Sequence, residues 1–371
     1  MRVLVTGASG LIGSNLAAAA AQQSWTVHGT WHGVPVQLRE GATSRLDIGD
    51  RHACVALAER FEPDVLVHAA ASVQLSRLQH EPALAAINVL GTEHTLHAAR
   101  VVRARYVLVS SDWVFGGDRP PTQCWREEDP TDPVNAYGRS KLACEQTVRE
   151  WAGDWLITRP ANVYGINLAL PLAGESHARH VWERSSLALR WVEHLRAGRP
   201  LPAPPDVYQC PTYAWDYAQR VCELIAQDCD GIYNTAGPDA LSRHDFLALL
   251  AQAFDCDPEL VHRADRESFL RACGETPDLP LPFNTALCAA RAAFALGRPA
   301  IDPRAGLRLM RDQLHRVLGP RPGATNGDPR ASGPRPGAMS GDPRASGSPP
   351  AASDGGEPAF AHANQIGGGR R

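Results

Sequence analysis

The chain has 371 residues, of which 44% are hydrophobic and 21% charged, which is typical of a globular protein with one or two domains. The formal net charge of −3 argues against attraction to nucleic acid or to an anionic membrane surface. No apolar run is long enough to span a bilayer, and the N-terminal MRVLVTGASG does not resemble a signal peptide. We therefore expect a cytoplasmic protein with a small-molecule substrate and with neither a nucleic-acid nor a membrane partner.

Short β-branched runs alternate with stretches rich in alanine and leucine over the first half of the chain. The predicted strands are 2–6, 27–30, 63–71, 106–110 and 155–159, and the predicted helices are 13–23, 82–100 and 137–151. Strands that alternate with helices form a parallel sheet with both faces covered. The sequence therefore predicts an α/β fold, a Rossmann-type doubly wound parallel sheet.

The pattern loosens after residue 164, where prolines cluster between 199 and 211 and helices are predicted at 214–228, 243–254 and 303–318. We predict an NAD(P)-binding domain over 1–164. A smaller C-terminal substrate-binding part follows over 165–318, and some of its elements pack back on the first domain. From 319 the segment GPRPGATNGDPRAS is followed by its near copy GPRPGAMSGDPRAS. Because this Gly-, Pro- and Arg-rich composition buries little apolar surface, we predict a disordered tail over 319–371.

The nine cysteines are scattered, are odd in number and include no CxxC pair. Paired cysteines at short spacing are the usual signature of a zinc site or a disulfide framework. We therefore expect reduced thiols and no metal site.

A glycine-rich stretch, TGASGLIG, follows the first predicted strand and opens the first predicted helix. Gly7 permits a tight turn, Gly10 lets the backbone approach a pyrophosphate, and Gly13 lets the helix pack close to the strand. Free N–H groups at the start of the helix then face the phosphates. The stretch predicts a dinucleotide site at Gly7, Ser9, Gly10, Leu11, Ile12 and Gly13.

The segment NAYGRSKLACE contains the only lysine of the chain, Lys141, whereas the other basic residues are all arginine. Tyr137 and Lys141 are four residues apart on a predicted helix, so their side chains emerge on one face. An ammonium beside a tyrosine stabilises the phenolate and lowers the tyrosine pKa, and arginine is not equivalent in that role. The pair therefore predicts an acid-base tyrosine assisted by lysine.

These motifs together resemble the extended branch of the short-chain dehydrogenase/reductase superfamily, in which the glycines are spaced TGxxGxxG. SSDWVFGG (110–117), PVNAYGRSKLACE (133–145) and PTYAWDYA (211–218) resemble segments of the dTDP-4-dehydrorhamnose reductase (RmlD-type) family. The resemblance extends over residues 1–318. The chain departs from the family pattern at 166–183, where the substrate pocket is expected. The segment RPANVYG (159–165) looks more like the extended branch in general.

The resemblance implies a third catalytic residue, Ser111, with Ser110 as the alternative. It also implies further cofactor contacts, which are Thr30, His32, Asp47, Ile48, Ala69, Ala70, Ala71 and Asn88. No acidic residue ends the second strand, where an acid would bind the ribose 2′-OH of NAD, and His32 could donate a hydrogen bond. This favours NADP(H) modestly over NAD(H).

The activity that the resemblance implies is hydride transfer to the ketone of a nucleotide-linked 4-keto-6-deoxysugar. Tyr137 would be the general acid, Ser111 would orient the carbonyl, and Lys141 would assist Tyr137 and hold the nicotinamide ribose. The candidate arginines for the diphosphate are Arg190, Arg196 and Arg199. Two alternatives stay open, a nucleotide-sugar epimerase of the same superfamily and a non-catalytic regulatory subunit like the methionine adenosyltransferase β subunit. Relatives commonly form homodimers.

Overall fold

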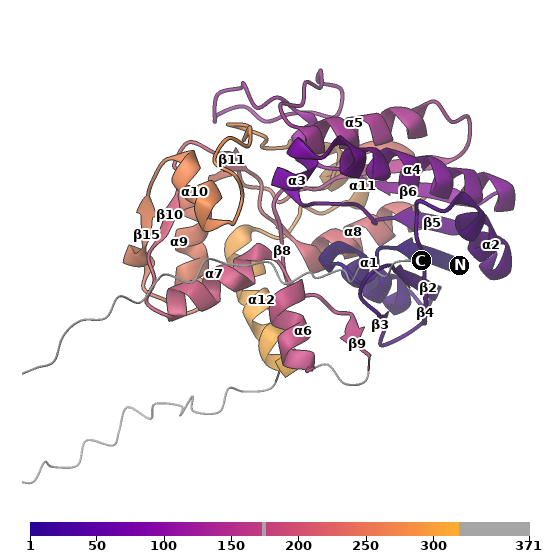
Figure 1. Ribbon diagram of the computed structural model, residues 1–371, viewed down its shortest axis with the longest axis horizontal. Coiled ribbons are helices and arrows are strands. Elements are labelled where there is room, and N and C mark those ends of the chain that lie inside the picture. Colours follow the sequence, from indigo (N-terminus) through magenta and orange to yellow (C-terminus); the bar gives the residue numbers. More distant parts are fainter. Residues whose placement is uncertain (173–175, 319–371) are drawn as a thin grey trace, which may run out of the picture. The chain divides into compact units, whose positions relative to one another are not determined.

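The computed structural model describes residues 1–172 and 176–318 of the chain (Figure 1). Over these residues it confirms the predicted α/β fold, with a parallel sheet and a smaller C-terminal part. The tail predicted at 319–371 lies outside the described residues. Among the helices that are described, none is long and apolar enough to cross a membrane.

The elements predicted for the first half of the chain all form, and their ends lie within a few residues of the predicted ones. The strands are β1 (Arg2–Thr6), β2 (Thr26–Trp31), β3 (Val36–Gln37), β4 (Ala42–Arg45), β5 (Val65–His68), β6 (Arg105–Val109), β7 (Trp155–Arg159), β8 (Val163–Tyr164), β9 (Leu170–Pro171), β10 (Leu201–Ala203), β11 (Tyr208–Gln209), β12 (Thr212–Tyr213), β13 (Gly231–Asn234), β14 (Leu241–Ser242) and β15 (Val261–Arg263). The helices are α1 (Leu11–Gln22), α2 (Arg51–Phe61), α3 (Leu75–His80), α4 (Pro82–Val102), α5 (Ala136–Arg149), α6 (His177–Arg184), α7 (Leu187–Arg196), α8 (Ala214–Ala226), α9 (Arg243–Ala253), α10 (Arg266–Ala272), α11 (Ala290–Leu296) and α12 (Pro303–Leu318), with 3-10 turns η1 (Asp112–Val114) and η2 (Pro258–Leu260).

The main sheet has seven strands in the order β13-β7-β6-β5-β1-β2-β4, and every neighbouring pair is parallel. The chain winds outward in both directions from β1, so the strand order reverses between β1 and β5. In open parallel sheets, ligands bind outside the carboxyl ends of the strands at this switch point. The glycine-rich turn after β1 and residues 69–71 after β5 both lie there.

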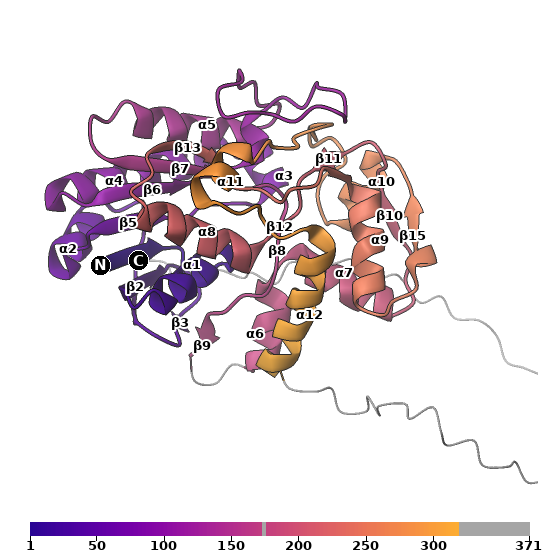
Figure 2. The same ribbon diagram turned by 180° about the vertical axis from the view of Figure 1, so that it is seen from behind.

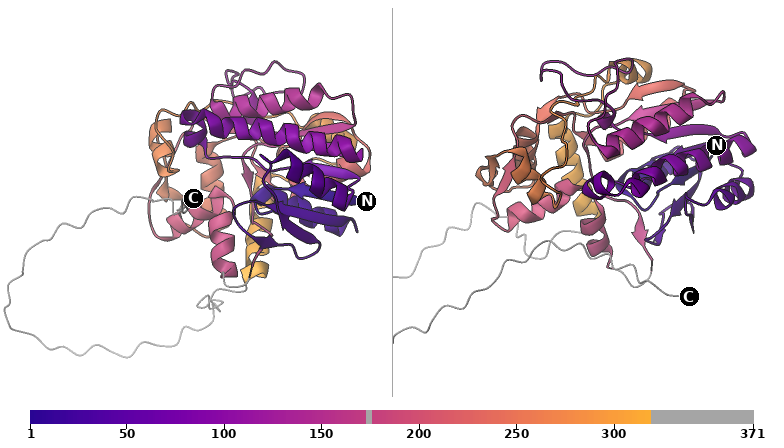
Figure 3. Two further views of the ribbon diagram at one scale, coloured as in Figure 1. Left: turned by 45° about the vertical axis from the view of Figure 1, so that its right-hand side comes forward. Right: turned by 45° about the horizontal axis from the view of Figure 1, so that its top comes forward.

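Each face of the sheet is covered by helices, which explains why its strands are continuous apolar runs. On β1, Val3 and Val5 pack in a core cluster with residues of α1 and α8, whereas Leu4 belongs to a second cluster with α2, α4 and α5. Figures 1 and 2, seen from opposite sides, show these two helical layers, and Figure 3 shows α4 and α5 along the sheet.

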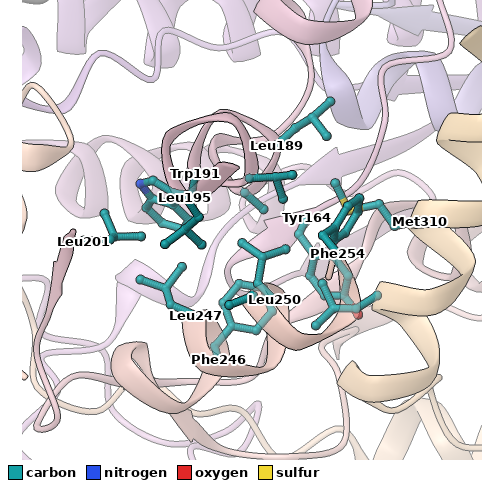
Figure 4. Packing of buried hydrophobic residues seen from close by; sticks show 14 of the residues in the cluster. Tyr164, Leu189, Trp191, Leu195, Leu201, Phe246, Leu247, Leu250, Phe254 and Met310 are labelled. Atoms are coloured by element: carbon teal, nitrogen blue, oxygen red, sulfur yellow. The ribbon is translucent and has the colours of Figure 1, made fainter. Parts of the chain in front are cut away.

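The C-terminal part has its own core, formed by α7, α9, α12 and the segment after β7. Tyr164, Trp191, Phe246, Leu250 and Met310 meet in this cluster (Figure 4). Later elements also return to the main sheet, since β13 pairs with β7 and α8 packs on α1. We keep the division at residue 164 as a proposal about which part binds the cofactor and which part binds the substrate.

Candidate active site

The glycine-rich turn brings three backbone segments into contact. Gly7 has φ of 73°, and a Cβ at this position would lie 2.8 Å from Cα of Ala70. A Cβ on Gly13 would overlap the carbonyl oxygen of Gly7. Only glycine therefore allows α1 to start this close to β1 and the turn to lie this close to the end of β5.

The start of α1 is free of side chains that would compete with a ligand. Gly10 caps the helix without a side-chain hydrogen bond, and the first turn contains no acidic residue. The N–H groups of such a first turn have no intrahelical acceptor and attract anions. Asn167 Nδ2 donates to the carbonyl oxygen of Ser9 at 2.8 Å, which ties the turn to the C-terminal part. The residues present therefore fit the pyrophosphate of a dinucleotide, with Leu11 and Ile12 in the first turn.

Asn88 joins the segment after β5 to α5. Its Oδ1 accepts from the backbone N–H of Ser72 at 2.7 Å, and its Nδ2 donates to Ser140 Oγ at 3.1 Å. Asn88 is 1% exposed, so both bonds satisfy buried groups. The bonds hold the segment that begins with Ala69, Ala70 and Ala71 next to the helix that carries Lys141.

A basic and an acidic side chain lie close together near the carboxyl end of β2. Thr30 is buried there, whereas His32 and Asp47 are exposed and lie 3.6 Å apart between Nε2 and Oδ2. Asp47 also accepts from the backbone N–H of Gly49 at 2.8 Å. Ile48 packs against Gly91 of α4. Although no acid follows β2 in sequence, the fold supplies one from the segment after β4.

Tyr137, Lys141 and Ser111 gather at the carboxyl end of β6. Asn135 caps α5 by accepting from the N–H of Gly138 at 2.9 Å, which places Tyr137 in the first turn of the helix. Burial raises the pKa of Tyr137 above its ordinary value, and the neighbouring hydroxyl of Ser111 acts in the opposite direction. The Trp113 ring meets the Tyr137 ring edge-on at 5.8 Å.

Lys141 is 5% exposed, and its Nζ donates to the carbonyl oxygen of Val109 at 2.7 Å. Burial lowers the pKa of Lys141. The effect of the ammonium on the Tyr137 pKa stays a prediction. Burial is also the main cause that lowers the pKa of His68 to about 3, and the charge of Lys141 adds to it, so His68 is neutral.

The two serines at the end of β6 have different partners. Ser110 Oγ donates to Glu145 Oε1 at 2.5 Å, and Glu145 forms a buried ion pair with Arg159 in which Nη2 and Oε2 are 2.6 Å apart. Ser111 instead interacts with Tyr137 and donates to Asp112 Oδ1 at 3.1 Å. The geometry thus keeps Ser111, rather than Ser110, as the candidate hydroxyl.

Residues 1–278 match the family model described as the RmlD substrate binding domain. The chain belongs to this family. It is 29% identical over 323 residues to a dTDP-4-dehydrorhamnose reductase of Mycolicibacterium smegmatis, with 86% of each chain covered. It is 28% identical over 262 residues to methionine adenosyltransferase 2 subunit beta of Xenopus tropicalis, with 68% of this chain and 72% of that one covered. A dTDP-4-dehydrorhamnose reductase of Bacillus anthracis, solved in complex with NADP, shares the fold with a TM-score of 0.66 at 21% identity, over 84% of this chain and 99% of that one.

This RmlD-family chain has a hydrogen-bond network behind Ser111 that sequence reasoning missed. Asp112 Oδ2 accepts from Gln209 Nε2 at 2.6 Å and from Thr285 Oγ1 at 2.5 Å. Asp112 is 2% exposed, and burial raises its pKa from 3.8 to about 6, although the three side-chain hydrogen bonds and the charge of Arg243 lower it. The only sequence signal was the position of Asp112 directly after Ser111, because Gln209 and Thr285 come from distant segments.

Within the described residues, no cluster of three or more His, Cys, Asp or Glu side chains could hold a metal ion. All nine cysteines are free thiols. The side chains that the fold brings together at the site are those of Ser111, Tyr137, Lys141 and the buried Asp112.

Proposed function

We propose that this chain is an NAD(P)H-dependent ketoreductase that acts on a nucleotide-linked keto-deoxysugar, as a dTDP-4-dehydrorhamnose reductase does. The observation that carries the proposal is that Lys141, one turn after Tyr137 on α5, donates to the carbonyl oxygen of Val109 just before Ser111, at the edge of the sheet where the glycine-rich turn lies. Membership of the RmlD family supports the same substrate class.

In the proposed mechanism, Tyr137 donates its proton to the carbonyl oxygen of the substrate as general acid. Ser111 orients that oxygen by hydrogen bonding. Lys141 places a buried positive charge behind the site. This charge stabilises the phenolate of Tyr137 as it forms. Bound NAD(P)H would supply the hydride that reduces the carbonyl carbon.

The protonation state of Tyr137 favours reduction over epimerisation. Burial raises the pKa of Tyr137, so the phenol keeps its proton at neutral pH. Reduction of a ketone begins with a protonated acid, whereas an epimerase that oxidises its substrate first begins with a phenolate base. A protonated Tyr137 supports the proposed reduction.

The choice between NADP(H) and NAD(H) depends on His32 and Asp47, which lie 3.6 Å apart at the end of β2. His32 would donate to a 2′-phosphate, whereas the carboxylate of Asp47 would repel it. We keep NADP(H) as the proposed cofactor. Asp47→Asn should raise the preference for NADPH over NADH, and an unchanged preference would mean that Asp47 does not face the ribose.

The proposal is tested by following NADPH and NADH oxidation at 340 nm with dTDP-4-keto-6-deoxysugars. Tyr137→Phe should lower the rate by about 100-fold or more, because a positioned general acid contributes about 10²–10⁴-fold. Tyr233→Phe is the matched control, since this tyrosine lies on the edge strand β13 away from the site, and it should retain the wild-type rate. Equal rates in the two variants would contradict the assignment of Tyr137.

A regulatory role is the second candidate, because the chain is also similar to methionine adenosyltransferase 2 subunit beta. That role requires a stable complex with a catalytic subunit and no turnover. Co-purification with a methionine adenosyltransferase, in a protein that oxidises neither NADPH nor NADH with any ketosugar, would favour it over the reductase.

A further inference from the structure

Cys124 and Cys288 lie on one face of a short contact between two segments that are far apart in the chain. Trp125 and Leu287 form a parallel bridge. The N–H of Trp125 donates to the carbonyl oxygen of Ala286 at 2.8 Å, and the N–H of Cys288 donates to that of Trp125 at 2.7 Å. Side chains alternate between the two faces of paired strands. The residue before Trp125 and the residue after Leu287 therefore emerge on the same face.

The two thiols also line one cavity, whose volume is about 430 Å³. Cys124 is exposed and Cys288 is partly exposed, so small solutes can reach both. Burial raises the pKa of Cys124, and the thiol of Cys288 raises it further, as expected for neighbouring thiols. A third cysteine of the cavity, Cys210, is buried and donates its thiol to the carbonyl oxygen of Leu287 at 3.5 Å.

Three cysteines around one cavity raise the question of a metal site. In the part of the chain that the structure describes, no group of three or more His, Cys, Asp or Glu side chains is arranged to hold a metal ion. The characteristic reaction of two neighbouring, accessible thiols is oxidation to a disulfide. We propose that Cys124 and Cys288, which are free thiols in this structure, form a reversible disulfide when the protein meets a peroxide.

The reaction consumes one hydrogen peroxide for each disulfide. The thiolate of Cys124, the more exposed of the two, attacks one oxygen of the peroxide. An S–O bond forms, the O–O bond breaks, and the second oxygen leaves as hydroxide, which takes up the proton that the thiol released. The thiolate of Cys288 then attacks Sγ of the Cys124 sulfenic acid, so that the S–S bond forms, the S–O bond breaks and the oxygen leaves as water. Two thiols are oxidised, and the peroxide is reduced to two waters.

The disulfide would fasten a segment that supports the candidate active site. Asn284 Nδ2 donates to the carbonyl oxygen of Gln123 at 2.8 Å, so the two segments already meet in the reduced protein. The next residue, Thr285, donates to Asp112 Oδ2 at 2.5 Å. A covalent bond at Cys288 therefore closes the chain close to the hydrogen bonds behind the candidate serine. Amide hydrogen exchange in both segments should slow by about tenfold or more on oxidation.

The test treats the full chain with a small excess of hydrogen peroxide at about pH 8, where a thiol with a raised pKa forms more thiolate than at neutral pH. The remaining thiols are alkylated in denaturant, and the digest is mapped by mass spectrometry. Wild type should give one cross-linked peptide pair that joins Cys124 to Cys288, lighter by two hydrogens than the separate peptides. Dithiothreitol should separate the pair and restore two titratable thiols per chain.

Cys229→Ser is the matched control, because Cys229 is another partly exposed thiol that does not line the cavity, and this variant should still form the cross-link. Cys288→Ser should form no cross-link at Cys124. Its Cys124 should instead be oxidised further, to the sulfinic acid, because no neighbouring thiol traps the sulfenic acid.

The wild-type map decides the inference even if a variant does not fold. Sulfinic acid at Cys124 in wild type without a cross-link would overturn it, and so would a disulfide that joins Cys124 to Cys210 in place of Cys288. The inference does not depend on the proposed reductase activity. The peptide map and the assay of NADPH oxidation therefore fail independently of each other.

Discussion

Replacing Asp112 by asparagine should remove a specific part of the pH dependence of stability. Asp112 is buried behind Ser111, and its pKa is raised from 3.8 to about 6 because burial outweighs the hydrogen bonds that it accepts. Between these two values the folded protein binds a proton that the unfolded chain releases. The free energy of unfolding contributed by Asp112 therefore decreases as the pH rises from about 4 to about 6.

The size of this effect follows from the shift in pKa. Two units of pKa correspond to about 3 kcal/mol over the whole titration, at about 1.4 kcal/mol per unit. Between pH 7.5 and 4.5, the part that is accessible to measurement is about 2 kcal/mol. Asparagine does not titrate, so the free energy of unfolding of wild type minus that of Asp112→Asn should increase by about 2 kcal/mol on going from pH 7.5 to pH 4.5.

The assay is urea unfolding followed by tryptophan fluorescence at several pH values between 4.5 and 7.5. Asp230→Asn is the matched control, because Asp230 is an exposed aspartate, and its profile should run parallel to that of wild type. Parallel profiles for wild type and Asp112→Asn would refute the reasoning, because they would mean that the Asp112 carboxyl is not the buried group described here.

Three further predictions concern the groups around the site. Glu145→Gln should destabilise the fold by about 3–5 kcal/mol because it leaves a buried arginine without its partner, whereas Glu267→Gln, in an exposed helical pair, should cost less than about 1 kcal/mol in the same urea experiment. Gly13→Ala should weaken NADPH binding by about tenfold or more in a fluorescence titration, since a Cβ there overlaps the glycine-rich turn, and unchanged affinity would argue against that turn as the cofactor site. Asn88→Ala should lower the free energy of unfolding by about 1–3 kcal/mol, because buried polar groups lose their partner, and a smaller change would show that water replaces the amide.

The features that the sequence predicted best are those that depend on residues close together in the chain. The glycine-rich turn is a single segment whose close contacts require glycine at Gly7 and Gly13. Tyr137 and Lys141 are one helical turn apart, so their common direction follows from helix geometry alone. The strand β13 (Gly231–Asn234) was missed, because GIYN is short and only partly apolar, and its pairing with β7 is what makes it a strand.

The features that were missed join segments far apart in the chain. Gln209 and Thr285 are 97 and 173 residues from Asp112, and no periodic pattern connects them. The contact that Lys141 makes with the end of β6 is of the same kind. Its Nζ donates to the carbonyl oxygen of Val109, 32 residues away in the chain, at 2.7 Å.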